Sequence, residues 1–578
     1  MKKISLLLFI FTVGVQQVNA QSIENGLSLY EQGDYERAIR ILQQSNNPEA
    51  QLFIGKSYFA LNNYLQALSY LNKVPSSSNP EIYHEAKYTA ALAYFQIDNF
   101  SMSLDELKSL SQVRPSSNVS RSALQLYDEI LGYLTLNQRK VVFLETINDE
   151  VRLDLLESSI GRVKYRSAIA FLELFKRSVE EYDNLRLSRI ETQLSDSIIY
   201  SQRYNPNQVI QSPKGISYNI GVVLPEFEFD APEYEIPQHL YFGIQLAIEE
   251  FNSTNTDQKA FISYKNSNSA DINAEGIITD LVWNQDVDVI IGPLFSGIAK
   301  EFSNLAEEYE IPMLLPLANA DSLDLYNNYV FQLNPSFSTQ GQIMARYAVN
   351  VLGYDTLGVI AEKGSLGAPA ARSFMHEVER NGGFIEYYFE ENLEELGYDI
   401  RDYTQYFTSD TLDSVSMVEA VYAPFTGTVA PTLVESMLTD LEAMRSNVAI
   451  LGSEEWMNVN LEDRRLSETE LFYTESFNVD TSTSKAQTFT SSFRIRFNTQ
   501  PNQFAYIGYD AAEIILTTLL KVKNPAYLRD ALKDLNNFNG LSSKISFRGT
   551  HVNQEVKIKR MPRDNDLLER QDIEFRRR

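Results

Sequence analysis

Cysteine is absent from this chain of 578 residues, and its absence excludes several chemistries at once. Without a thiol there is no cysteine nucleophile, no disulfide, no cysteine-ligated zinc or iron–sulfur cluster and no cysteine-linked lipid anchor. Histidine is nearly as scarce. The four histidines are too scattered along the chain to suggest a metal site, so we expect neither a metal nor another cofactor: His84, His239, His376 and His551.

Positive charge is also in short supply. The chain has 50 basic and 77 acidic residues and a formal net charge of −27. Such a surface repels nucleic acid and anionic membranes, so we expect neither as a partner and interpret most of the charge as a solvated surface. With 44% hydrophobic and 22% charged residues the composition is that of a globular protein, and the length suggests three or four domain-sized units.

The common sequence signatures of enzymes are missing. No two glycines stand at positions i and i+2, which excludes a G-x-G-x-x-G loop and a G-x-S-x-G nucleophile elbow. There is no P-loop either. One S-x-x-K match, Ser482 to Lys485, lies in a polar run where no apolar helix would desolvate the lysine. We therefore expect a protein without enzymatic activity.

Long apolar runs are limited to the N-terminus. The run from Ile4 to Val15 follows Lys2 and Lys3 and precedes a short segment with small residues that ends at Ala20. This pattern is typical of a secretory signal peptide over residues 1–20, and the run is shorter than the roughly 20 residues that span a bilayer. We expect cleavage after Ala20, no membrane insertion afterwards, and a periplasmic protein that is not a lipoprotein.

Three segments of the N-terminal third align with one another, at spacings of 29 and 36 residues. Each has a polar turn, an aromatic residue after it, a small residue three positions later and a leucine four positions further on. The small residue suits a close approach of two helices, and the aromatic and the leucine would fill the interface between them. The aligned residues are Tyr35, Ala38 and Leu42; Tyr64, Ala67 and Leu71; and Phe100, Ser103 and Leu107.

These segments resemble the tetratricopeptide repeat, whose period is about 34 residues. The resemblance predicts an α-helical solenoid over residues 21–140, which usually presents a groove to a protein partner but can also be a purely structural platform. Helical periodicity continues over Ser122–Leu136, Leu153–Leu174 and Tyr182–Tyr200, and a polar stretch follows at Ser201–Ser217. We assign residues 141–213 to a helical spacer and linker.

The rest of the chain alternates short buried strands with helices, which predicts parallel α/β sheets. The pattern restarts once, which suggests two lobes with a cleft between them. Ligand-binding residues should follow the carboxyl ends of the strands. Predicted strands are Tyr218–Pro225, Ala260–Ser267, Val287–Pro293, Ile311–Leu317, Tyr329–Ser336, Thr356–Glu362, Ala420–Phe425 and Asn447–Ser453; predicted helices are His239–Asn252, Asp271–Trp283, Ser296–Glu308 and Gln340–Leu352.

Four segments in this order resemble the type I periplasmic binding proteins of the leucine/isoleucine/valine-binding kind. They begin DVDVIIGPLFSGIAKEF, NYVFQLNPSFSTQGQIM, QFAYIGYDAAEIILTTLL and LSSKISFRGTHVNQEVKIKRM. The resemblance predicts a two-lobed α/β binding domain of this type over residues 214–565, followed by a polar tail over residues 566–578.

The resemblance also implies a site for an amino-acid-like ligand. Ser296, at the start of a helix, would bind the ligand carboxylate, and Ser296 would also suit the N-cap position of that helix. Ala318 and Asn319 occupy the next ligand segment. The family's second-lobe aromatic residue would be Tyr422 or Phe425, its ammonium partner Glu454, and Trp456 would line the same cleft. The predicted ligand residues are Ser296, Ala318, Asn319, Tyr422 and Glu454.

Two features depart from the family pattern. Leu366 stands where the family often stacks a tyrosine on the ligand, and the glycine-rich loop after the first strand is replaced by an acidic, proline-containing loop, Pro225–Pro237. Both put amino-acid specificity in question.

Two functions are therefore compatible with the sequence. The first is an exported binding protein for an amino-acid-like ligand, serving uptake or sensing, whose repeats dock an envelope protein such as a permease. The second follows from a further resemblance, to the lipoprotein activators of penicillin-binding proteins, which combine the same two modules but carry a lipidated cysteine. In that case the protein is a scaffold or regulator of a peptidoglycan synthase with a vestigial cleft.

Overall fold

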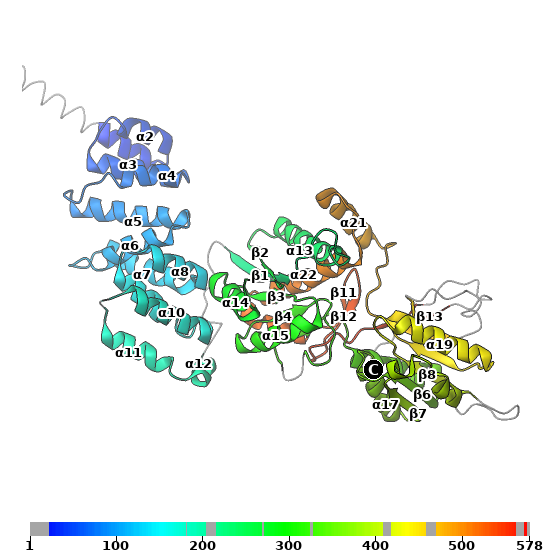
Figure 1. Cartoon of the computed structure of the whole chain (residues 1–578). Coiled ribbons are helices and arrows are strands. Elements are labelled where there is room, and N and C mark those ends of the chain that lie inside the picture. The colour runs from blue at the N-terminus through cyan, green and yellow to red at the C-terminus, as the bar shows by residue number, and fades with distance from the viewer. Residues whose placement is uncertain are drawn as a thin grey trace, which may run out of the picture. The chain divides into compact units, whose positions relative to one another are not determined.

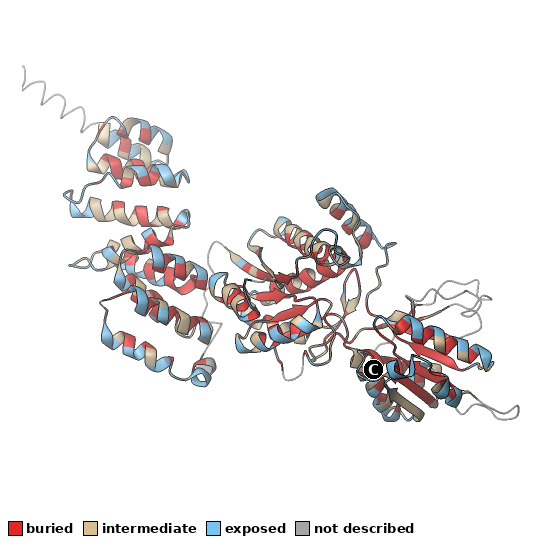
Figure 2. Cartoon of the chain, viewed as in Figure 1, coloured by how far each residue is buried: buried red, intermediate tan, exposed pale blue. Residues whose placement is uncertain are grey.

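The computed structural model describes residues 22–180, 182–203, 215–268, 271–323, 327–408, 418–457, 470–561 and 572–574. Contacts divide the chain into two units, Met1–Pro213 and Lys214–Arg578 (Figure 1). Each unit has its own buried side chains (Figure 2). The predicted signal peptide lies outside the described residues, as do most of the predicted linker and all but three residues of the predicted tail.

The first unit consists of helices joined in pairs by short turns, and the three aligned turns have the same geometry. A residue with positive φ comes first, and the following Asp or Asn caps the second helix of the pair through its side chain. The predicted repeat is therefore present as three equivalent helix pairs. The turn residues are Gly33 and Asp34, Asn62 and Asn63, and Asp98 and Asn99.

Small residues let the paired helices approach closely, as the sequence predicts. Ala38, Ala67 and Ser103 are fully buried. A Cβ atom added at Gly55 would lie 2.5 Å from the Leu71 side chain on the facing helix. In the third pair the Ser103 hydroxyl donates a hydrogen bond to the backbone carbonyl of Ala91 at 2.9 Å.

Two of the helices predicted after the repeats are interrupted in the structure, so their prediction as continuous helices is wrong. The predicted helix over Leu153–Leu174 is interrupted at Gly161, which has a φ of +78°. Its N–H donates to the Tyr200 hydroxyl, which donates in turn to the carbonyl of Val163. The predicted helix over Tyr182–Tyr200 is interrupted before Asp196, whose side chain caps a new helix. Apolar periodicity continues through both turns, so it could not reveal them.

The helices of the first unit are one over residues 22–31, α2 (Tyr35–Leu42), α3 (Pro48–Ala60), α4 (Tyr64–Leu71), α5 (Pro80–Gln96), α6 (Phe100–Ser111), α7 (Asn118–Tyr133), α8 (Leu136–Glu145), α9 (Asp149–Ser159), α10 (Tyr165–Ser178), α11 (Asn184–Gln193) and α12 (Ser197–Arg203).

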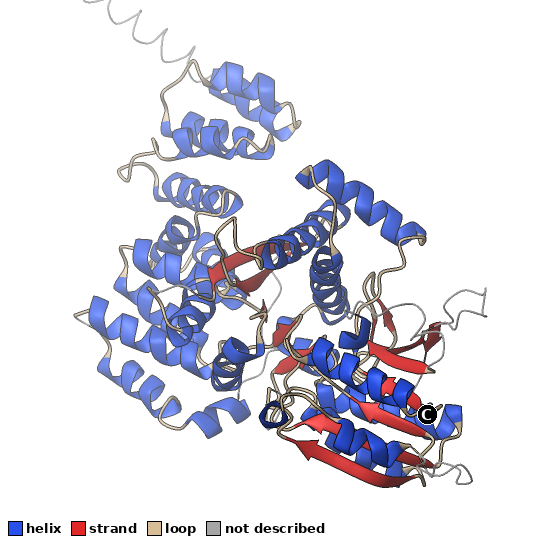
Figure 3. Ribbon diagram, turned by 45° about the vertical axis from the view of Figure 1, so that its right-hand side comes forward, coloured by secondary structure: helices blue, strands red, loops and turns tan. Residues whose placement is uncertain are grey.

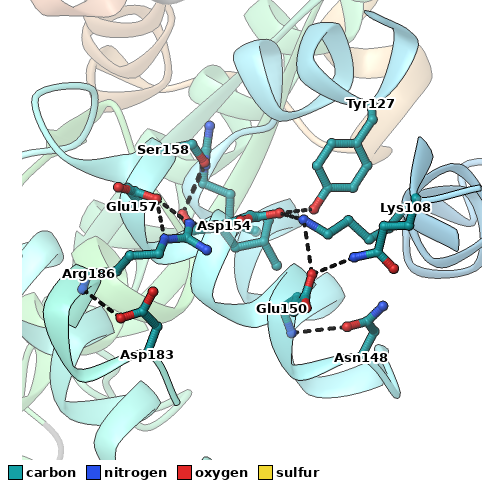
Figure 4. Close-up of polar contacts among 12 residues, drawn as sticks. Lys108, Tyr127, Asn148, Glu150, Asp154, Glu157, Ser158, Asp183 and Arg186 are labelled. Carbon is teal, nitrogen blue, oxygen red and sulfur yellow. Dashed lines mark hydrogen bonds and ion pairs between the residues drawn. The ribbon is translucent and has the colours of Figure 1, made fainter. Parts of the chain in front are cut away.

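A polar network connects the repeats to the helices that follow them (Figure 4). The Asp154 carboxylate on α9 accepts hydrogen bonds from Lys108 of α6 at 2.5 Å, Tyr127 of α7 at 2.8 Å and Arg186 of α11 at 2.8 Å. Burial opposes the charge of Asp154, but these hydrogen bonds outweigh it and hold the pKa of the carboxyl below its usual value. One carboxylate thus joins four helices.

The first unit is drawn as helices, and the second as helices and strands (Figure 3). The first lobe of the second unit is built on a five-stranded parallel sheet with the order β2-β1-β3-β4-β5. Helices α13 and α22 cover one face and α14 and α15 the other. The elements are β1 (Ile216–Leu224), α13 (Glu235–Thr254), β2 (Gln258–Asn266), α14 (Ala274–Thr279), a π-helical turn η2 (Asp280–Asn284), β3 (Val289–Ile291), α15 (Ser296–Glu308), β4 (Met313–Leu315), β5 (Val330–Gln332), α21 (Ser484–Phe497), α22 (Gln503–Val522), η7 (Pro525–Tyr527), α23 (Leu528–Lys533) and the hairpin β11 (Phe538–Asn539) and β12 (Lys544–Ile545).

The second lobe contains a seven-stranded sheet with the order β14-β13-β10-β9-β8-β6-β7, of which β13 pairs antiparallel with both β10 and β14. Helices α16 and α17 pack on one face and α19 on the other. The elements are α16 (Phe337–Tyr347), η3 (Ala348–Leu352), β6 (Thr356–Glu362), α17 (Ala368–Arg380), β7 (Phe384–Glu391), η4 (Glu394–Leu396), α18 (Arg401–Thr404), η5 (Gln405–Phe407), β8 (Ala420–Ala423), α19 (Ala430–Ala443), β9 (Ala449–Gly452), η6 (Glu454–Met457), β10 (Leu471–Glu475), β13 (Lys557–Arg560) and β14 (Asp572–Glu574).

The chain passes between the two lobes three times: between β5 and α16, between β10 and α21, and between β12 and β13. Each predicted strand of both lobes is present, although several are shorter than predicted. Within the described ranges no helix combines the length and the apolar character needed to cross a membrane.

Candidate functional site

Ser296 is the first residue of α15, at the carboxyl end of β3 in the first lobe. The predicted N-cap role of Ser296 is wrong, because Phe295 occupies the N-cap position and makes no side-chain cap. The hydroxyl oxygen of Ser296 instead accepts hydrogen bonds from the backbone N–H groups of Asn319 and Ala320, both at 3.3 Å. These contacts leave the hydroxyl proton free to be donated.

The structure thereby brings Ser296 together with the predicted ligand segment that follows β4. Ala318 is 2% exposed and its side chain packs in the core, so it offers the segment only its backbone. The side chain of Asn319 is half-buried. Gln332, at the end of β5, donates from its side-chain amide to the carbonyls of Ala318 at 3.2 Å and Ala320 at 3.1 Å.

Gln332 was not predicted from the sequence. It is fully buried, and its side-chain oxygen has no hydrogen-bond partner. Its backbone N–H donates to the carbonyl of His551, and its carbonyl accepts from the N–H of Asn553, in the third connection between the lobes. A glutamine in the otherwise apolar strand VFQL is the signal that could have identified it, because buried polar side chains are uncommon without a specific role.

The predicted aromatic positions of the second lobe lie in the core. Tyr422 is 1% exposed within β8, and its ring stacks on Phe374 at a centroid distance of 4.2 Å. Trp456 is fully buried, stacks on Phe425 and donates from its indole N–H to the carbonyl of Ala423 at 2.9 Å. In this structure the side chains of Tyr422, Phe425 and Trp456 therefore contribute to the packing of the lobe, and their place at a ligand stays a prediction.

Glu454 lies directly after β9, and its carboxylate accepts a hydrogen bond from the N–H of Ser476, just after β10, at 3.5 Å. Its side chain is exposed to solvent. Partial loss of water around the carboxyl nevertheless raises its pKa to about 7, and the neighbouring carboxylates of Glu475 and Glu455 also raise it.

The two departures from the family pattern, Leu366 and the loop after β1, also follow the carboxyl ends of strands. Leu366 follows β6 and is 56% exposed, beside Gly367, whose N–H donates to the Thr426 hydroxyl. The start of the loop after β1 is anchored, because the N–H of Glu226 donates to the side chains of Asn266 and Asn268. Asn268 returns a hydrogen bond to the Glu226 carbonyl at 2.9 Å.

The structure thus assembles Ser296, Ala318 and Asn319 into one half-site on the first lobe and places Glu454 at the corresponding edge of the second lobe. Among the residues that the structure describes, no three His, Asp or Glu side chains form a group that could hold a metal ion. The half-site offers a hydroxyl and a helix N-terminus, which suit an anion, and the second lobe offers a carboxylate, which suits a cation.

Solved structures to which this chain is similar include a branched-chain amino acid transporter substrate-binding protein from Streptococcus pneumoniae in complex with isoleucine, which shares 19% identity over 62% of this chain and 99% of that chain, with a TM-score of 0.41. A putative branched-chain amino acid transporter protein from Rhodospirillum rubrum shares 17% identity over 62% and 100%, with a TM-score of 0.48. A solute-binding protein from Rhodopseudomonas palustris in complex with 3,4-dihydroxybenzoic acid shares 16% over 62% and 96%, with a TM-score of 0.42.

Sequence families are matched in both units, whereas no curated protein matches the chain. Residues 16–74 match the model described as anaphase-promoting complex, cyclosome, subunit 3, a tetratricopeptide-like family. Residues 240–561 match the model described as periplasmic binding protein. Because this second match covers more than half of the 578 residues, the chain belongs to the periplasmic binding protein family, with a tetratricopeptide-like helical region preceding its binding domain.

Proposed function

We propose that this protein is a non-catalytic binding protein that holds a small amino-acid-like ligand between its two α/β lobes. The observation that carries the proposal is the half-site on the first lobe, where Ser296 and the segment after β4 are joined by hydrogen bonds. Membership of the periplasmic binding protein family supports it, because the members of that family bind substrates and do not convert them.

The chemistry of the two lobes is complementary to that of an amino acid. On the first lobe, the Ser296 hydroxyl proton and the first N–H groups of α15 can be donated to a carboxylate, aided by the positive end of the helix dipole. On the second lobe, the Glu454 carboxylate can accept hydrogen bonds from an ammonium group. The side-chain amide of Asn319 can donate from its NH2 group to the carboxylate or accept with its oxygen from the ammonium group.

We propose further that the helical region docks a protein partner. The charge of the chain is unevenly divided: residues 1–213 contain 21 basic and 23 acidic residues, and residues 214–578 contain 29 and 54. The helical region is therefore nearly neutral, and it exposes apolar side chains such as Leu65 (70%), Leu144 (66%) and Ile147 (90%). Single exposed apolar side chains are common on protein surfaces, so this part of the proposal rests mainly on the repeat architecture, which typically presents a groove to a protein partner. For a chain exported to the periplasm, a permease would be a fitting partner.

A thermal-shift and calorimetric screen of L-amino acids and cell-wall fragments on the full chain tests the ligand proposal. We expect at least one α-amino acid to stabilise the protein, and Ser296→Ala and Glu454→Gln each to weaken its binding by about tenfold. Ser484→Ala is the matched control for Ser296, since Ser484 is the exposed first residue of α21, and Glu435→Gln, at an exposed position of α19, is the control for Glu454. If nothing binds, or if both site variants bind as the wild type does, the proposal fails.

A specific observation favours a second candidate, the scaffold or regulator of peptidoglycan synthesis with a vestigial cleft. The N–H groups of Asn319 and Ala320 already donate to Ser296, and the second-lobe aromatic residues are buried, so the site has fewer free groups than expected. This candidate predicts that the full chain binds a purified peptidoglycan synthase in the absence of a small ligand. It also predicts that Leu144→Gln with Ile147→Asn abolishes the complex; an unchanged complex would count against docking at this surface.

A further inference from the structure

A buried ion pair lies close to Glu454 in the second lobe, and the proposed function does not yet use it. The ammonium group of Lys559 on β13 is 2.5 Å from the carboxylate of Glu475 on β10. The two side chains are only 7% and 18% exposed. Loss of hydration offsets much of the attraction in a buried ion pair, so stability alone is a weak explanation for its presence.

The strands bring this pair to the edge of the sheet at which Glu454 lies. β10 and β13 pair antiparallel, in a register that makes Glu475 and Lys559 diagonal neighbours on one face of the sheet. Glu475 is the last residue of β10, and the N–H of the residue after it donates to the Glu454 carboxylate at 3.5 Å. Lys557, on the same face of β13, donates instead to the side chain of Asn478 at 3.3 Å.

The charges at this edge compete with one another. The carboxylates of Glu475 and Glu455 disfavour the ionised form of Glu454, whereas the ammonium group of Lys559 favours it. Lys559 forms its ion pair with Glu475 rather than with Glu454. The protein therefore contains a cation that acts on Glu454 but is held by another carboxylate.

We propose that Glu475 is a positioning residue, which holds the Lys559 ammonium in an ion pair and so reserves the Glu454 carboxylate for the ammonium group of a ligand. This inference rests on the proposed function, because it takes Glu454 as the ammonium partner. Without Glu475, the buried charge of Lys559 would need another counter-charge, and Glu454 is the neighbouring carboxylate on which it already acts. An internal pair between Lys559 and Glu454 would leave no carboxylate for the ligand. Selectivity for amino acids over carboxylates without an ammonium group therefore depends on Glu475.

Carbon-13 NMR titration of the Glu454 carboxyl in the full chain tests this role without a ligand, the resonance being assigned by its loss in Glu454→Gln. In Glu475→Gln we expect the pKa of Glu454 to fall below its wild-type value, because a carboxylate is removed and an ammonium group is released toward Glu454. The double variant, Glu475→Gln with Lys559→Met, lacks both charges of the pair. The pKa of Glu454 should therefore be higher in the double variant than in Glu475→Gln.

Calorimetric titration at pH 6 and pH 8 gives the second readout. The probes are L-leucine and L-phenylalanine, and 4-methylpentanoate and 3-phenylpropionate, which are the same compounds without the ammonium group. At pH 8, Glu475→Gln should weaken the binding of the amino acids about tenfold and change that of the other two compounds by less than about twofold. The double variant should bind the amino acids within about threefold of the wild type, since no internal cation then competes for Glu454.

Glu470→Gln is the matched control, because Glu470 also forms an ion pair with β13, to Arg560 at 3.1 Å, but precedes β10 instead of ending it. An unchanged pKa of Glu454 in Glu475→Gln, or the same change in Glu470→Gln, would overturn the inference. A double variant that binds amino acids no better than Glu475→Gln would overturn it too. If no amino acid binds the wild type, the proposed function fails, and the NMR titration alone decides whether Glu475 holds Lys559 away from Glu454.

Discussion

The side-chain amide of Gln332 donates a hydrogen bond to the backbone carbonyl of Ala318 at 3.2 Å. A second hydrogen bond to the carbonyl of Ala320 holds the same segment, whose N–H groups donate in turn to Ser296. Because the backbone of Gln332 also pairs with His551 and Asn553, the half-site is connected to one of the three segments that join the lobes. Bending at that connection and occupation of the half-site are therefore expected to be coupled.

Replacement of Gln332 by methionine tests this connection. Methionine has a similar volume but cannot donate to Ala318 and Ala320, so we expect the affinity for a ligand of the half-site to fall about tenfold. The free energy of unfolding should fall by only about 1 kcal/mol, since the unpaired side-chain oxygen is removed as well. Calorimetry and chemical denaturation measure the two effects. Gln340→Met is the matched control, because Gln340 is a buried glutamine that bonds instead to Pro335 and Thr474; an equal loss of affinity in both variants would contradict the specific role.

If Glu454 is the ammonium partner that we propose, ligand binding should depend on pH. With its pKa raised to about 7, its carboxyl is largely protonated at pH 6 and ionised at pH 8. An ammonium-bearing ligand should therefore bind more tightly as the pH rises from 6 to 8. Stability should change in the opposite direction, because the folded state holds the proton more firmly than the unfolded chain, so the contribution of Glu454 is lost as the pH rises from about 4.5 through about 7.

In the Glu454→Gln variant, neither the ligand affinity nor the stability should show the pH dependence attributed to Glu454. The control ligand is 3-phenylpropionate, which lacks an ammonium group and should not gain affinity over this range. Affinities that are constant between pH 6 and pH 8 for an amino acid would contradict the role of Glu454 as the ammonium partner.

Asp154 should be a major source of stability in the helical region. Asp154→Asn removes the charge that Lys108, Tyr127 and Arg186 share, and we expect the free energy of unfolding to fall by about 2–3 kcal/mol. Because the folded pKa is lowered, this contribution is present above about pH 4 and is lost as the pH falls through the lower folded value. The difference between wild type and variant should therefore shrink at acid pH in urea titrations.

Asp149→Asn is the control on the same helix. Asp149 is 54% exposed and pairs only with Arg152 one turn away, so the expected loss is below about 0.5 kcal/mol. A loss in Asp154→Asn no larger than this would show that the network contributes little.

Because Gly55 packs closely against Leu71, alanine should be unfavourable at position 55, although alanine normally favours a helix. The added Cβ would lie 2.5 Å from the Leu71 side chain, and we expect Gly55→Ala to lower the free energy of unfolding by about 1–2 kcal/mol. In a Leu71→Ala background the close leucine atoms are absent and the Ala67 carbonyl oxygen, 3.3 Å from the added Cβ, is the remaining near neighbour, so the same substitution should cost at least about 1 kcal/mol less than in the wild type. Thermal denaturation of the four proteins measures this difference; an equal loss in both backgrounds would contradict it.

Local sequence determined much of the architecture. The turn residues Gly33, Asn62 and Asp98 indicated the repeat because a positive φ followed by a capping Asp or Asn is a local requirement. Strand β6 and helix α15 were predicted with the bounds that the structure gives them. An apolar strand between polar loops can be recognised from the local sequence without knowledge of distant contacts. The turn at Gly161 was missed because the apolar period runs on through it.

Only those features of the candidate site that depend on a residue's position along the chain could be predicted from the sequence. Ser296, Asn319 and Glu454 follow strand ends, and parallel strands bring their carboxyl ends to one edge, so their approximate place was determined by the sequence. Burial is different, because it depends on which face of the sheet a helix covers. Tyr422 and Trp456 fill the core, whereas the side chain of Asn319 stays half-buried beside Ser296.

The sequence by itself thus determined the two modules, the order of strands and helices, and the absence of cysteine chemistry. Only the tertiary structure decided which side chains are available to a ligand. It joined the Ser296 hydroxyl to the N–H of Asn319 and the Gln332 side-chain amide to the segment that contains Asn319, and it buried the Tyr422 ring against Phe374. The physical reason is that periodicity and capping act over a few residues, whereas burial and hydrogen bonding across strands join residues far apart in the chain.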